Sequence, residues 1–279
     1  MKNEKNILIA FVLNFFFSVF EALGGFFTGS ITLVSDAVHD MGDAASIGIA
    51  WLLEKKSRQK PDDNYTYGYA RYSVMGGMIT NIILITGSLL VVYNAVIRMV
   101  HPVDIDFTTM IILSVIGLMV NGVAVFFTRE GDSLNRRAVN LHMLEDVLSW
   151  IVVLISAIVM KFTGYAFLDP LMSVGIALFV LTHAIRHMTE ITDIFFDRTP
   201  RGIDISHIRS ELMELDGITD VHHIHIRSFD GYQNIATMHI VTDSDSYRVK
   251  ALVREQLKKF NIQHCTLELE GSNEKCGEK

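Results

Sequence analysis

The stretch ILIAFVLNFFFSVFEALGGFFT, residues 7–28, contains a single ionisable side chain, Glu21. A helix of about 20 apolar residues crosses the hydrocarbon core of a bilayer. Similar stretches follow along the chain at residues 31–53, 74–100, 107–128, 139–162 and 168–188. The sequence therefore predicts an α-helical membrane domain of six transmembrane helices. We interpret the first stretch as a spanning helix and not as a removed signal peptide, because it has no small-residue cleavage pattern.

The composition agrees with a membrane protein and excludes two other classes. Half of the residues are hydrophobic, and the mean hydropathy is +0.33. The net charge of −7 argues against a nucleic-acid partner, which normally requires a basic face. The two cysteines, Cys265 and Cys276, are too few for a disulfide framework.

The distribution of cationic residues predicts the orientation of the spans. Connections on one side of the membrane contain only Arg98 and Lys161, both close to helix ends. The opposite side carries Lys2, Lys5, Lys55, Lys56, Arg58, Lys60, Arg71, Arg129, Arg136 and Arg137. Because lysine and arginine accumulate in cytoplasmic loops, we expect both termini in the cytoplasm. The short loops and compact tail indicate a bacterial inner (plasma) membrane.

The hydropathy falls after residue 198, and a second domain is expected over residues 199–279. Its pattern predicts helices at 204–215 and 246–260, and strands at 217–228, 232–242 and 262–270. Asp230-Gly231 is a hairpin signal between the first two strands. The order αββαβ is typical of a small, ferredoxin-like α+β domain.

Two predicted spans share an unusual pair of residues. His39 and Asp43 are four residues apart in the second span, and His142 and Asp146 repeat the spacing in the fifth. Residues four apart lie above one another on one helix face. Two facing pairs supply two imidazoles and two carboxylates, a tetrahedral set that suits Zn²⁺ and also Cd²⁺, Co²⁺, Ni²⁺ or Fe²⁺.

Other interpretations of these charges stay open on the sequence alone. Ionisable residues at bilayer depth usually mark an ion pathway, but a set of salt bridges would need the same residue types. Asp36 and Glu21 are candidates to line the same pathway. Glu21 equally suits a hydrogen bond between helices.

The chain resembles the cation diffusion facilitator family of zinc and heavy-metal efflux transporters over most of its length. The residues that carry the resemblance are GSITLVSDAVHDMGD at 29–43, YGYAR at 67–71, HMLED at 142–146, DP at 169–170 and DVHHIHI at 220–226. The resemblance implies that the two His/Asp pairs form the transport site. It also implies a homodimer, and proton-coupled antiport that exports divalent cations from the cytoplasm.

The resemblance also implies a metal-binding, dimerising tail domain with a regulatory zinc ion. Matching residues suggest His222, His239 and His264 as ligands, with Glu270 as an additional carboxylate. Strict strand alternation places His223 and His225 on the face opposite His222. Cys276 is either a further thiolate ligand or a free thiol in the tail.

Some members of the family bind a second zinc ion between the second and third spans, through an aspartate and two histidines. Here Asp62 matches the aspartate, but Tyr65 and Tyr69 occupy the histidine positions. A phenol is a poor zinc ligand at neutral pH, so the sequence predicts that this loop site is absent.

Two other classes of function compete with transport. A membrane zinc hydrolase needs an open coordination position and a separate general base, and two complete pairs leave no vacancy. We therefore expect no enzymatic activity. A non-transporting metal sensor is the alternative function, but it does not explain ionisable groups inside two spans.

Overall fold

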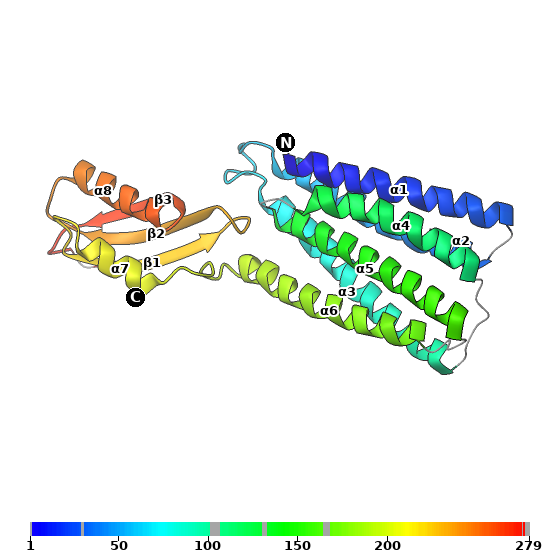
Figure 1. The fold of residues 1–279 in the computed structure, drawn as a ribbon. Helices are drawn as coiled ribbons and strands as arrows, with labels where there is room; N and C mark the ends of the chain where they lie inside the picture. Colours follow the sequence, from blue (N-terminus) through cyan, green and yellow to red (C-terminus); the bar gives the residue numbers. More distant parts are fainter. Residues whose placement is uncertain are drawn as a thin grey trace. The chain divides into compact units, whose positions relative to one another are not determined.

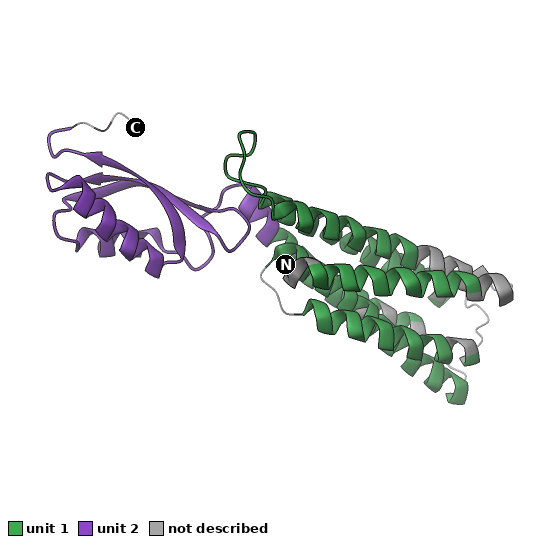
Figure 2. Ribbon diagram, turned by 90° about the horizontal axis from the view of Figure 1, so that it is seen from above, with its two compact units in different colours: residues 1–189 green, residues 190–279 purple. Residues whose placement is uncertain are grey.

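The protein consists of six long helices followed by a small α+β domain in a computed structural model (Figure 1). The structure describes the backbone of residues 2–28, 31–100, 107–129, 133–163, 168–274 and 276. Within the helices, the side chains of residues 2–4, 24–28, 31–39, 98, 107, 109–110, 168–169, 172–173 and 176 lie outside the description. The chain divides into two compact units, Met1–Thr189 and Glu190–Lys279 (Figure 2).

The membrane unit confirms the expected helix order. Its helices are α1 (Lys2–Thr28), α2 (Ile31–Ser57), α3 (Arg71–Val100), α4 (Phe107–Thr128), α5 (Leu134–Thr163) and α6 (Leu168–Phe195), of which the last six residues fall in the second unit. Within the described residues, α1, α3, α4 and α5 contain apolar windows sufficient for a membrane span. Several helices run past the hydrophobic stretches expected from the sequence, because polar residues such as Glu54 and Lys55 continue a helix readily.

A buried polar junction joins α2, α3 and α5. Ser73 Oγ donates to Glu54 Oε2 at 2.7 Å, and Asn135 Nδ2 donates to the Ala50 carbonyl at 2.7 Å. A Cβ added to Gly76 would lie 2.7 Å from Asn135 Oδ1, so α3 approaches α5 closely only because this residue is glycine. The junction fixes α2 against α5, the two helices that carry the predicted metal ligands.

The end of α4 and the beginning of α5 are joined by Arg136, which is 1% exposed and therefore differs from an ordinary surface cation. Its guanidinium donates to the carbonyls of Phe127 at 2.6 Å and Thr128 at 3.1 Å. A cation at a helix C-terminus satisfies terminal carbonyls and interacts favourably with the helix dipole. Arg136 thus joins the end of α4 to the beginning of α5.

The second unit contains α7 (Ile205–Met213), β1 (Asp220–Ser228), β2 (Asn234–Val241), α8 (Ser246–Lys259) and β3 (Ile262–Glu270), as the αββαβ pattern predicts. The sheet order is β1-β2-β3, with β1 and β2 antiparallel and β2 and β3 parallel. Apolar residues of both helices pack on one face of the sheet to form the core. Gly231, with φ of 92°, forms the predicted hairpin turn.

A β-bulge interrupts β1 and changes which residues share a face. His222 pairs with His239 and His225 pairs with Thr237, so two residues of β1 lie opposite one residue of β2. His223, at the bulge, has a φ of 47° in the left-handed region. An extra residue in one strand interrupts the alternation of side chains between the two faces of the sheet, so the residues beside it point in changed directions. The prediction that His223 and His222 occupy opposite faces is therefore wrong: the rings of both contact His239, with centroids 5.0 and 5.4 Å away.

The contact between α4 and α5 gives a test of helix packing. A Cβ at Gly117 would clash with the Trp150 ring, whereas one at Gly122 would meet nothing within 4 Å. Gly117→Ala should therefore destabilise the protein by about 1–3 kcal/mol through overpacking. Thermal unfolding in detergent should show a lower Tm for Gly117→Ala than for Gly122→Ala. Gly117→Ala should lower the Tm much less in a Trp150→Leu background than in the parent, because the smaller side chain leaves room for the added methyl group. Equal Tm values for the two single variants would contradict this packing.

Candidate metal centres

Three predicted ligands meet between α2 and α5. Asp43 comes from α2, and His142 and Asp146 come from successive turns of α5. One ligand atom from each of the three lies within 4.8 Å of the others. His142 Nε2 is 3.6 Å from Asp43 Oδ1, and these two residues are only 3% and 8% exposed. The structure thus assembles a buried group of one imidazole and two carboxylates.

The geometry of this group fits a cation better than it fits a salt bridge. In a tetrahedral zinc site, ligand nitrogens and oxygens at about 2.0–2.2 Å from the metal are separated by about 3.4 Å. The distance between His142 Nε2 and Asp43 Oδ1 is close to that value. Neither ring nitrogen of His142 has a hydrogen-bond partner within the described part of the chain. A buried nitrogen without a partner is costly, and a bound cation would satisfy it.

The fourth predicted ligand, His39, lies on α2 one turn before Asp43, but its side chain is outside the described residues, as is that of Asp36. Glu145, beside Asp146 in the sequence, accepts a hydrogen bond from Ser88 of α3 at 3.1 Å. It therefore has a contact away from the three clustered ligands.

The polar residues of α1 share one buried face. Asn14, Ser18 and Glu21 are each less than 5% exposed. Ser18 Oγ lies 3.9 Å from Met41 Sδ on α2, which is two residues from Asp43. This face therefore packs close to the cluster, although the cluster of described ligand atoms does not include Glu21.

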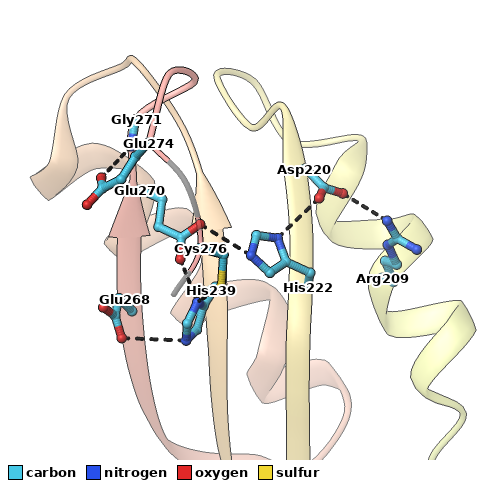
Figure 3. A network of polar contacts seen from close by, with 9 residues as sticks. All are labelled: Arg209, Asp220, His222, His239, Glu268, Glu270, Gly271, Glu274 and Cys276. Atoms are coloured by element: carbon cyan, nitrogen blue, oxygen red, sulfur yellow. Dashed lines mark hydrogen bonds and ion pairs between the residues drawn. The ribbon is translucent and has the colours of Figure 1, made fainter. Parts of the chain in front are cut away.

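A second group of side chains that could hold a metal ion lies on the sheet face opposite the core (Figure 3). His222 of β1, His239 of β2, Glu270 at the end of β3 and Cys276 each place a ligand atom within 4.8 Å of the others. His239 Nδ1 is 2.6 Å from Glu270 Oε1, and His222 Nε2 is 3.2 Å from Glu270 Oε2. The antiparallel pairing of His222 with His239 explains why two residues distant in sequence share this site.

Neighbouring charges orient the ligands of this second group. His222 Nδ1 lies 3.1 Å from Asp220, whose other oxygen accepts from Arg209 at 2.8 Å. Such a carboxylate contact fixes the ring so that Nε2 faces the site. His222 Nε2 is buried, and its polar contact among the described residues is the one with Glu270 at 3.2 Å, another member of the same group, so a metal ion could bind between the two.

The surroundings of Glu270 favour the ionised form of its carboxyl group. Burial raises the pKa of Glu270, but hydrogen bonds with His239 and Cys276 and the charges of His222 and His239 outweigh it and lower that pKa overall. The carboxylate is therefore ionised at neutral pH, which is the form that binds metal.

The structure does not bring His264 to this group. In the parallel pairing of β2 with β3, His264 lies beside Ile235, whereas His239 lies beside Glu268. Four residues along a strand correspond to about 13 Å. His264 is exposed at the other end of the strand pair. Its prediction as a ligand alongside His239 therefore fails within one subunit, because the register of β3 was not evident from the sequence.

In the loop between α2 and α3, the aspartate and the tyrosines contact one another instead of forming a metal site. Tyr69 donates its hydroxyl to Asp62 at 2.6 Å, and this bond raises the pKa of Tyr69 to about 12. Lys56 lies over the Tyr69 and Tyr72 rings, at 5.7 and 4.9 Å from their centroids. The phenol is protonated at neutral pH, which supports the prediction that it does not bind metal.

Known proteins resemble both units of the chain. A family model for the cation efflux transmembrane domain matches residues 7–195, and one for the cytoplasmic domain of cation efflux proteins matches residues 200–272. The cadmium, cobalt and zinc/H(+)-K(+) antiporter of Bacillus subtilis is 31% identical over 277 residues, which cover 96% of this chain and 89% of the relative.

Two further relatives have similar coverage. The zinc transporter ZitB of Yersinia pestis is 31% identical over 275 residues, covering 96% of this chain and 88% of the relative. The metal cation efflux system protein CzcD of Cupriavidus metallidurans is 27% identical, covering 96% of this chain and 87% of the relative.

The loop geometry leads to a prediction about zinc stoichiometry. Tyr65→Phe combined with Tyr69→Phe should leave the number of zinc ions bound per chain unchanged, because protonated phenols do not hold the metal. Zinc content after dialysis, measured by mass spectrometry, tests this. Asp43→Ala serves as the comparison and should reduce the zinc content. Loss of one zinc per chain in the double phenylalanine variant would show that the loop is a metal site.

Proposed function

The chain belongs to the cation diffusion facilitator family of cation efflux proteins, and from that membership we propose that it is a proton-coupled antiporter that exports divalent metal cations, chiefly zinc, from the cytoplasm. The observation that carries the proposal is the meeting of Asp43, His142 and Asp146 between two membrane helices. With His39 one turn before Asp43, the group becomes a four-ligand site for the transported ion. Because one relative is named for cadmium and cobalt as well as zinc, we include those two ions among the proposed substrates.

The ligand chemistry couples the metal to protons. Zinc binds neutral imidazole and ionised carboxylate, so its arrival releases protons and its departure allows them to return. An imidazole in water titrates near pH 6.5, within reach of cellular pH values. An inward proton gradient can therefore drive zinc outward if the site opens alternately to the two sides.

The tail is proposed to bind a regulatory zinc ion and to hold two subunits together. His222, His239 and Glu270 supply two nitrogens and one carboxylate, and the buried His222 Nε2 without a hydrogen bond fits a metal ligand. The match to the cytoplasmic domain of cation efflux proteins supports this assignment and a homodimer.

The bacterial relatives support a location in the plasma membrane, and the distribution of lysine and arginine supports the cytoplasmic placement of both termini. We assign no enzymatic activity, because four ligands around one ion leave no open position for a hydrolytic water.

The transport site is tested by removing its ligands one at a time. Alanine at His39, Asp43, His142 or Asp146 should abolish zinc flux in proteoliposomes, because each change deletes one of four ligands. His183→Ala is a matched control, since the His183 ring contacts the Phe179 carbonyl of its own helix at 2.9 Å. The control should retain flux. Near-normal flux in two or more of the four variants would reject the assignment.

Proton coupling is tested separately from zinc binding. Proteoliposomes containing a pH-sensitive dye should show proton movement opposite to zinc movement, and an imposed pH gradient should accelerate zinc flux. The Asp146→Ala variant should show neither effect. Zinc flux that moves no protons and ignores the gradient would identify a uniporter instead.

A further inference from the structure

The segment after β3 turns back toward the histidines of the sheet. Ser272 donates its backbone N–H to Asp243 Oδ1 at 3.0 Å, and its hydroxyl bonds the other oxygen of the same carboxylate. Gly271 N–H donates to Glu274 Oε2 at 3.1 Å, and Glu274 N–H donates to the Gly271 carbonyl at 2.9 Å. These bonds make a tight turn anchored beside the end of β2. The turn leads to Cys276, which lies against His239 (Figure 3).

We propose that the Cys276 thiolate is the fourth ligand of the cytoplasmic metal site, with His222, His239 and Glu270 as the other three. This inference rests on the proposed metal binding by the tail and goes beyond it, because it assigns a sulfur ligand and with it a metal preference.

The distances support a tetrahedral arrangement. Zinc–sulfur bonds of about 2.3 Å and zinc–nitrogen bonds of about 2.0–2.1 Å separate the two ligand atoms by about 3.5 Å in a tetrahedron. Cys276 Sγ lies 3.6 Å from His239 Nδ1, and all four ligand atoms lie within 4.8 Å of one another. When a metal ion binds, the contact between His239 and Glu270 would be replaced by one bond from each of these residues to the ion.

The other cysteine provides an internal comparison. Cys265 contacts the hydrophobic core of the sheet, and burial raises the pKa of its thiol, opposed only in part by Arg254. Raised pKa values disfavour the thiolate that binds metal. Cys276 instead lies beside two imidazoles and a carboxylate, where a divalent cation would stabilise the thiolate.

A thiolate ligand gives the tail site a selectivity that differs from that of the membrane site. Two imidazoles, one carboxylate and one thiolate carry two negative charges, which balance one divalent cation. Sulfur favours zinc, cadmium and cobalt over hard ions such as magnesium and manganese. The tail site is thus selective for thiophilic ions, whereas the ligands between α2 and α5 contain nitrogen and oxygen only.

Cobalt spectroscopy tests the assignment in the full-length chain. His142→Ala with Asp146→Ala is the background, so that the membrane site does not bind the added Co²⁺. Under reducing conditions, Co²⁺ should produce visible bands of tetrahedral cobalt together with a near-ultraviolet sulfur-to-cobalt charge-transfer band. Both should saturate at one cobalt per chain.

Cysteine variants on this background decide the outcome. Cys276→Ser should lose the charge-transfer band and keep weakened visible bands, with a Kd for Co²⁺ raised at least tenfold, whereas Cys265→Ala should match the background. A charge-transfer band that survives in Cys276→Ser would overturn the inference. Tetrahedral bands without any charge-transfer band would overturn it as well, while leaving the proposed tail site intact. The absence of all cobalt bands would reject the tail metal site itself.

Discussion

The cost of placing ionisable side chains inside a bilayer is the constraint on which the rest of the membrane unit depends. Such groups persist when they pair, face water or bind an ion. Asp43, His142 and Asp146 are assembled from two helices, with His142 Nε2 and Asp43 Oδ1 at the separation expected of two ligands of one metal. The polar junction of Glu54 with Asn135 holds the same two helices together away from the ligands. In α2 and α5, the residues placed to bind the ion are therefore different from the residues that hold the two helices together.

The tail unit obtains its site from a different kind of structure. Cross-strand pairing places His222 beside His239, and the bulge at His223 adds a third imidazole to the same face. A non-glycine residue in the left-handed region is strained and persists where the surrounding structure requires it. The hydrophobic core lies on the other face, so the candidate metal ligands contribute little to the packing that holds the fold together. Glu270 and Cys276 complete the group from the end of β3 and the segment after it.

The sequence predicted the parts of this protein that depend on periodicity and hydropathy. The six long helices, the αββαβ order and the Gly231 turn follow from local patterns, and the spacing of His142 and Asp146 follows from the helix repeat. The bulge at His223 and the register of His264 depend on contacts between strands, which local patterns do not determine. The position of Cys276 beside His239 depends on the turn that Ser272 anchors through its hydrogen bonds to Asp243, which is a tertiary interaction. The bulge, the register of β3 and the position of Cys276 therefore determine which residues make up the tail site, but they do not alter the predicted fold.

X-ray absorption at the zinc edge can show directly whether helices α2 and α5 form one four-ligand transport site. The measurement uses the full-length chain with His222→Ala and His239→Ala, so that zinc binds between the helices alone. The spectrum should show four nitrogen or oxygen ligands at about 2.0–2.1 Å, scattering from two imidazoles, and no sulfur near 2.3 Å. His39→Ala should remove one of the two imidazole contributions. A six-coordinate oxygen shell, or a spectrum without imidazole scattering, would contradict the assignment.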